Sequence, residues 1–231
     1  MAASALGAGL VLSAAASAAI VVASSGPSAA QYPVGKKLAD TDRITLQAGD
    51  SVTVLDKRGT KVLRGPGRLA VSLPGKPAPN PVLAALTRQD AASRARTGAV
   101  RRGAMPRPSS PNLWLVDLDK PGTTCVTAPN SVQVWRAEAD KAATYRIRSP
   151  GGSGENAGTI AFPAATATAN WDTVKAPISD GGSYTIAPQG GTFRFVVLAD
   201  PPEDGEALAA VLIEKGCAAQ LDLLSRTLAA G

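Results

Sequence analysis

The chain contains no histidine and few of the other residues that most enzymes use for catalysis. Its 231 residues include two cysteines, two methionines and three each of Trp, Tyr and Phe. Without histidine there is no Ser-His-Asp or Cys-His nucleophile pair and no His-ligated zinc, copper or haem. Two cysteines are too few for an iron–sulfur cluster or a four-cysteine zinc site. No GxxxxGK[ST] or GxGxxG loop is present. The sequence therefore predicts a non-enzymatic protein without catalytic residues, cofactor or metal.

The N-terminal thirty residues carry no charged side chain. An Ala-rich apolar run over residues 5–23 precedes a Ser-Ser-Gly-Pro break, and Ser28-Ala29-Ala30 matches the small-residue pattern before a cleavage site. The pattern predicts a signal peptide over residues 1–30, cleaved after Ala30, and a periplasmic or secreted protein. Two alternatives stay open. Residues 5–23 could instead anchor the chain in the inner membrane, or the start codon could be misplaced.

The two cysteines fit an exported protein. Cys125 lies in a β-like run, and Cys217 lies between two helical patterns. An even pair in an exported chain predicts a disulfide, and closing a loop of this length stabilises a fold by roughly 4–5 kcal/mol. The alternative is a pair of buried thiols that behave as small apolar groups.

Residues 31–75 show short segments of alternating apolar and polar residues separated by glycine turns. This period-two pattern predicts a small β-meander, which is too small to be stable alone.

Residues 76–111 predict a basic, Pro-rich linker with one short helix. Asn80 is the expected N-cap, with Pro81 at the first helical position and the helix running to about Arg96.

The net charge is +4 over 31–75, +6 over 76–111 and −4 over 112–231. The arginines of the linker are candidate contacts for an anionic polymer, or they form a solvated linker that contacts the acidic half of the chain. They are Arg94, Arg96, Arg101, Arg102 and Arg107. No aromatic residue lies between them, so nucleic acid is not an expected partner.

Residues 112–231 predict a β-sandwich followed by helices. About seven short strands separated by turns are typical of an antiparallel immunoglobulin-like sandwich, with a partly open barrel as the alternative. From residue 203 the apolar residues follow a helical spacing, with acidic residues at the helix start and Gly216 at a helix end. The sequence thus predicts a mainly β protein with a C-terminal helical hairpin.

A few side chains are candidates for chemistry. The carboxylates of Asp117, Asp119, Asp172 and Asp180 could serve as acid and base, and the first two could bind calcium weakly. The alternative interpretation places all four at solvated strand ends and turns. The tryptophans Trp114, Trp135 and Trp171 could line a sugar-binding face, but they fit core positions better in a chain with few aromatics.

One segment resembles a known family. Residues 46–55, with the later Gly59, Val62-Leu63 and Gly65-Pro66-Gly67, are similar to the β-repeat of FecR-type periplasmic sensor domains, over about residues 43–73. The C-terminal part, with Gly122 to Val126, the Asp180-Gly181 turn and the run from Gly216-Cys217 to Leu224, resembles exported proteins of Gram-negative bacteria. These resemblances imply a β-fold and an envelope location. We expect a non-catalytic exported module that binds or scaffolds an envelope protein or anionic polymer; the alternative is a FecR-type sensor.

Overall fold

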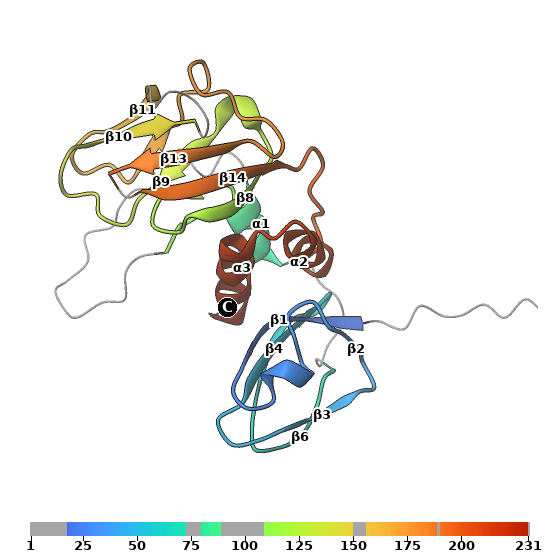
Figure 1. The fold of residues 1–231 in the computed structure, drawn as a ribbon. Coiled ribbons are helices and arrows are strands. Elements are labelled where there is room, and N and C mark those ends of the chain that lie inside the picture. The colour runs from blue at the N-terminus through green and yellow to red at the C-terminus, as the bar shows by residue number, and fades with distance from the viewer. Residues whose placement is uncertain (1–17, 73–79, 89–108, 150–155, 189, 231) are drawn as a thin grey trace, which may run out of the picture.

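The computed structural model of the protein describes residues 18–72, 80–88, 109–149, 156–188 and 190–230. Two β-rich units are joined by the helices α1, α2 and α3 (Figure 1). The strands of the N-terminal unit are β1 (Ala18–Ser25), β2 (Lys37–Ala39), β3 (Arg43–Leu46), β4 (Ser51–Asp56), β5 (Gly59–Arg64) and β6 (Gly67–Ala70). Those of the C-terminal unit are β7 (Val116–Asp117), β8 (Gly122–Val126), β9 (Gln133–Trp135), β10 (Ala143–Arg148), β11 (Asn156–Phe162), β12 (Thr168–Asn170), β13 (Ser183–Ala187) and β14 (Gly191–Val197). The helices are α1 (Pro81–Thr87), α2 (Gly205–Glu214) and α3 (Ala218–Ala230), with 3-10 turns at Ala29–Gln31 and Pro129–Ser131.

The N-terminal unit consists of a four-stranded sheet and a two-stranded sheet around one apolar core. The larger sheet has the order β2-β1-β4-β5, and β3 pairs with β6. Alternating residues such as Val52 and Val54 are fully buried between the sheets. The strands predicted over 43–73 are present, but their pairing is not that of a simple meander. β3 pairs with β6, although the β4–β5 hairpin lies between them in sequence and belongs to the other sheet.

Part of the predicted signal peptide forms the strand β1 of the N-terminal unit. β1 lies between β2 and β4 and pairs with both. Residues 19–22 are at most 4% exposed. Cleavage after Ala30 would remove this central strand and its core side chains, so that boundary is wrong for a chain folded in this way. Most of the predicted anchor, residues 5–17, lies outside the described residues, and residues 18–23 belong to β1.

The C-terminal unit is a sandwich of two sheets. One sheet has the order β11-β10-β13-β14-β8 and the other has the order β12-β9-β7. Side chains of both sheets, such as Val134 and Phe195, meet in a shared core. The mainly β fold is confirmed, but the sandwich is not wholly antiparallel: β14 pairs with β8 in parallel, as does β7 with β9. Alternation along a strand indicates which side chains share a face, and it carries no information on strand direction.

The helices also follow the sequence signals, except at the end of α1. Asn80 caps α1 by accepting hydrogen bonds from two backbone N–H groups, as predicted. The helix ends at Thr87 rather than near Arg96, because Arg88 has extended backbone angles. α2 and α3 form the predicted helical pair, and Gly216 between them has a φ of +74°, which favours glycine.

The two units share a third apolar core around the helices. It contains side chains of α2 and α3, such as Leu212 and Leu224, together with Ile20, Val22 and Leu55 of the N-terminal unit. The small N-terminal unit is therefore stabilised by packing on the helices, in line with its limited core. None of the helices in the described part of the chain has the length and hydrophobicity needed to cross a bilayer.

Candidate functional site

The disulfide between Cys125 and Cys217 is confirmed. Both residues are fully buried, and the bond joins β8 to the junction of α2 and α3. The side chain of Gln220 strengthens the same contact. Its amide accepts from Cys125 N–H and donates to the carbonyl oxygens of Cys125 and Leu113, at 2.7–2.8 Å. β8 is an edge strand, and the helix covers part of that edge with these hydrogen bonds.

The four predicted carboxylates do not form one site. Asp117 accepts a hydrogen bond from Asp119 N–H at 3.0 Å, while Asp172 accepts from Lys175 N–H at 3.1 Å and Asp180 from Val197 N–H at 3.0 Å. Each is a turn interaction close in sequence or across a strand end. Burial and the nearby Asp119 raise the pKa of Asp117. Among the described residues, no group of three His, Cys, Asp or Glu side chains is arranged to hold a metal ion.

The tryptophans contribute to the interior and not to an exposed platform. Trp135 and Trp171 are 4% and 3% exposed. Trp171 packs edge-on against Tyr184 and Phe195, and its indole N–H donates to the Ala176 carbonyl at 2.8 Å. Trp114 is half-buried and packs against the helix core. The core interpretation is therefore confirmed for Trp135 and Trp171, whereas Trp114 lies partly buried at the edge of the helix core.

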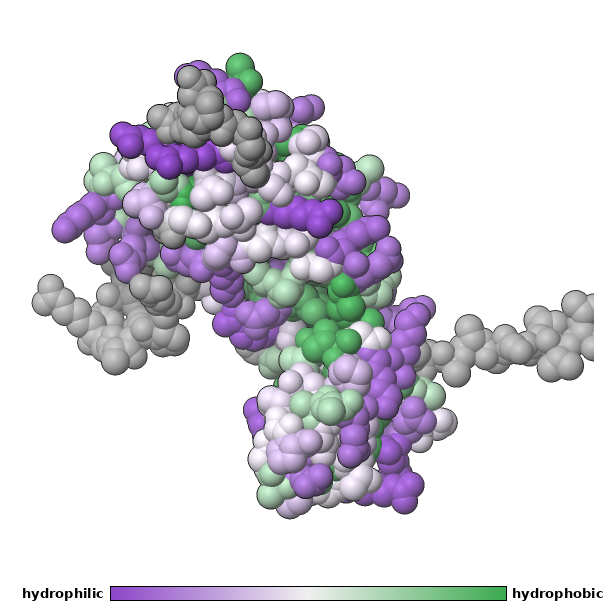
Figure 2. Space-filling model, viewed as in Figure 1, coloured by the Kyte–Doolittle hydropathy of each residue, from purple (hydrophilic) through white to green (hydrophobic). Residues whose placement is uncertain are grey.

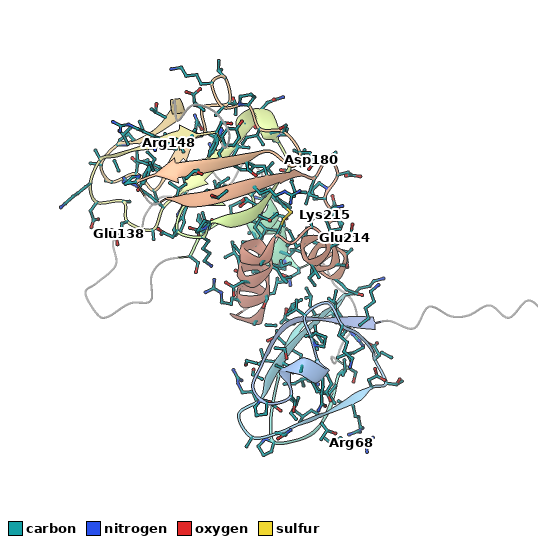
Figure 3. All side chains as sticks on the ribbon, in the orientation of Figure 1. Arg68, Glu138, Arg148, Asp180, Glu214 and Lys215 are labelled. Atoms are coloured by element: carbon teal, nitrogen blue, oxygen red, sulfur yellow. A yellow bond between two sulfur atoms is a disulfide. The ribbon has the colours of Figure 1, made fainter. Side chains whose placement is uncertain are left out.

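The first candidate binding feature is an open cleft where α2 meets the sandwich. Its volume is about 320 Å³. Figure 3 shows Asp180, Glu214 and Lys215 together at this place. The lining residues are Thr123, Asp180, Gly181, Arg194, Val196, Val197, Glu214 and Lys215. Lys215 pairs with Glu214 at 3.0 Å. The cleft thus holds charges of both signs, and Asp180 and Glu214 each already accept a hydrogen bond.

The second feature is the outer surface of the five-stranded sheet, which continues from the cleft. The register places Arg148 opposite Thr185, Thr185 opposite Thr192, and Arg194 opposite both Ser183 and Thr123. Residues that are opposite each other or two apart on a strand share a face. We call this surface the basic sheet face. It consists of Arg146, Arg148, Arg194, Thr123, Thr144, Thr159, Ser183, Thr185 and Thr192.

The helices cover only one end of this face. Val196 and Cys125, which are opposite each other and lie on the same side as Arg194, belong to the helix core. Arg146, Arg148 and Arg194 are exposed. Figure 2 shows the largest hydrophobic area on the viewed side over α2, below the sandwich. The basic sheet face is therefore a polar surface beside an apolar one.

A smaller cleft, of about 150 Å³, lies between the N-terminal unit and the start of α2. Two of its charged lining groups, Arg58 and Asp56, are paired with each other. Arg58 binds Asp40 and Asp56 at 2.6 Å, and the hydrogen bond to Asp56 raises the pKa of the guanidinium. Burial, followed by the charge of Asp204, raises the pKa of Glu206. The two ion pairs of Arg58 lie within the N-terminal unit, where they hold the β4–β5 turn against the segment between β2 and β3.

Sequence reasoning singled out a different basic segment. The five linker arginines lie outside the described residues, so their role as polymer contacts stays a prediction. The arginines of the basic sheet face were missed. The alternation of Thr144–Arg148 already separates the arginines from Ile147, but only the pairing of β10, β13 and β14 brings Arg148 and Arg194 to one surface.

Comparisons with models of known protein families, with curated proteins and with solved structures found no match. The resemblance of residues 43–73 to FecR-type domains stays a prediction.

Proposed function

We propose that the protein is a non-catalytic binding or scaffolding module that works in the bacterial cell envelope, outside the cytoplasm. The observation that carries this proposal is the buried disulfide. Cys125 and Cys217 are fully buried and bonded, and such structural disulfides persist in oxidising compartments. The open polar surface of the sandwich supports the binding role.

The N-terminal strand constrains how export would process the chain. Because β1 supplies the centre of a sheet, a removed leader has to end before Ala18 for the N-terminal unit to keep this fold. We therefore propose that the exported protein retains residues 18–30, in place of the predicted start at Gln31.

The test is expression of the full chain in a Gram-negative host, followed by cell fractionation, intact-mass measurement and thiol counting on the denatured, unreduced protein. We expect an envelope or periplasmic location, no free thiol and a mass that includes residues 18–30. Sedimentation with isolated envelope fragments tests the binding role. Two free thiols together with a cytoplasmic location would overturn the proposal.

A further inference from the structure

One surface of the C-terminal unit is basic, although the unit as a whole is acidic. Residues 112–231 carry a net charge of −4, yet none of the strands β8, β10, β11, β13 and β14 contains an Asp or Glu. The same five strands carry Arg146, Arg148 and Arg194 on their outer side. Within the described part of the chain, none of these three guanidinium groups has a hydrogen bond or ion pair. An unneutralised group of cations on an otherwise acidic unit attracts anions.

The spacing of the cations suits an extended ligand better than a compact one. Arg148 and Arg194 lie two strands apart, with Thr185 and Thr192 between them. From standard sheet dimensions, their Cα atoms are about 12 Å apart. The hydroxyl groups of Thr185 and Thr192 lie 3.5 Å from each other in this gap. A ligand that reaches both arginines therefore has to present separated negative charges and cross a strip of hydroxyl groups.

The cleft extends this surface toward α2. Arg194 lines the cleft together with Lys215, a fourth cation that, unlike the three arginines, is paired with a carboxylate. The carboxylate of Glu214 is paired with Lys215, and that of Asp180 accepts from Val197 N–H. These two carboxylates limit the basic surface at its helix end, and the open direction runs back across the sheet toward Arg148.

We propose that the basic sheet face binds an acidic polysaccharide, an inference that rests on the envelope function proposed above. Hydroxyl side chains and guanidinium groups together bind sugar hydroxyls and carboxylates or sulfates. The aromatic residues of these strands, such as Tyr184 and Phe195, belong to the inner core, so the face has no platform for stacking nucleic-acid bases. The face also lacks large apolar side chains that would insert into a lipid surface.

The experiment compares the full, disulfide-bonded chain with three arginine variants. The test variant is Arg146→Gln, Arg148→Gln and Arg194→Gln. The matched control is Arg43→Gln, Arg64→Gln and Arg68→Gln, which removes the same charge from exposed positions on the N-terminal unit. A third variant changes the five linker arginines to Gln. Retardation is measured in native gels that contain polygalacturonate, with neutral dextran as the reference polymer, at several salt concentrations.

We expect polygalacturonate, but not dextran, to retard the wild type, with an effect that weakens as salt rises. The test variant should bind at least about tenfold more weakly, and the matched control should stay within about twofold of the wild type. Unchanged thermal melting of all variants shows that they fold.

Five results would overturn the inference. Four are an unaffected test variant, an equal loss in the matched control, a loss confined to the linker variant, and tighter binding of single-stranded DNA or anionic vesicles than of polygalacturonate. The fifth is a wild type that polygalacturonate does not retard; if that wild type still sediments with envelope fragments, only the polysaccharide face is refuted. A cytoplasmic, thiol-containing protein refutes the envelope function whatever the gels show.

Discussion

The side-chain amide of Gln220 forms hydrogen bonds with the edge strand β8, as a neighbouring strand would. Its three hydrogen bonds pair the N–H and C=O groups of Cys125 and the C=O group of Leu113, all within the buried helix contact. Buried backbone groups are almost always paired, since an unpaired one loses its hydration without compensation. One polar residue at 5% exposure thus stabilises the contact between β8 and α3.

Replacing Gln220 with leucine should leave these backbone groups unpaired. We expect Gln220→Leu to lower the free energy of unfolding by about 2–4 kcal/mol in urea denaturation. The exposed Gln47→Leu control should change it by less than about 0.5 kcal/mol. Equal effects of the two variants would show that the amide contributes nothing specific.

Asp117 should make the protein less stable at neutral pH. Burial raises its pKa above the ordinary value of 3.8, so the folded state favours the protonated form. The stability from this group is present below pH 4 and is lost as pH rises through the folded pKa. Asp117→Asn keeps the oxygen that accepts from Asp119 N–H, and it should raise the free energy of unfolding at pH 7 but not at pH 3. Denaturation curves at both pH values check this, and a variant that is less stable at pH 7 would contradict it.

At the scale of elements, the α2–α3 junction is held by one covalent bond together with the apolar core around the helices. The disulfide ties this junction to β8 across a sequence separation of 92 residues. A crosslink that closes a long loop stabilises chiefly by restricting the unfolded chain. Removing the disulfide should therefore destabilise α2 and α3, which it attaches to β8, before it destabilises the sandwich.

Cys217→Ser should lower the free energy of unfolding by about 2–5 kcal/mol. Hydrogen exchange should show loss of protection in α3 before β10 and β13. Reductant should produce the same shift in the wild type and no further shift in the variant. Protection lost first in the sandwich would refute the assignment of the disulfide to the helix contact.

At the scale of the whole molecule, the helices couple two β units that have separate cores. Leu55 is 1% exposed and belongs to the helix core, whereas Leu63 is 4% exposed and belongs to the core of the N-terminal unit alone. Equal truncations at these positions should therefore have different consequences for cooperativity.

We expect Leu55→Ala and Leu63→Ala each to cost about 2–5 kcal/mol, as core truncations do. Leu55→Ala should also divide the calorimetric transition in two, since it weakens the contact between units. In the Leu63→Ala variant, hydrogen exchange in β10 and β13 should be unchanged. A single transition in the Leu55 variant would mean that the units are coupled elsewhere.

The local signals of the sequence determined most elements and the disulfide partners. Alternation predicted β4, β5 and β10, helical spacing predicted α2 and α3, and two cysteines allow only one intramolecular bond. Only the tertiary structure decided that residues 18–25 form a central strand, because an uncharged apolar run fits a buried strand as well as a leader. It also decided the β3–β6 pairing and the parallel β8–β14 pair. The basic sheet face follows from these pairings, because the period along a strand fixes the face of each side chain, whereas contacts between distant segments select the neighbouring strand.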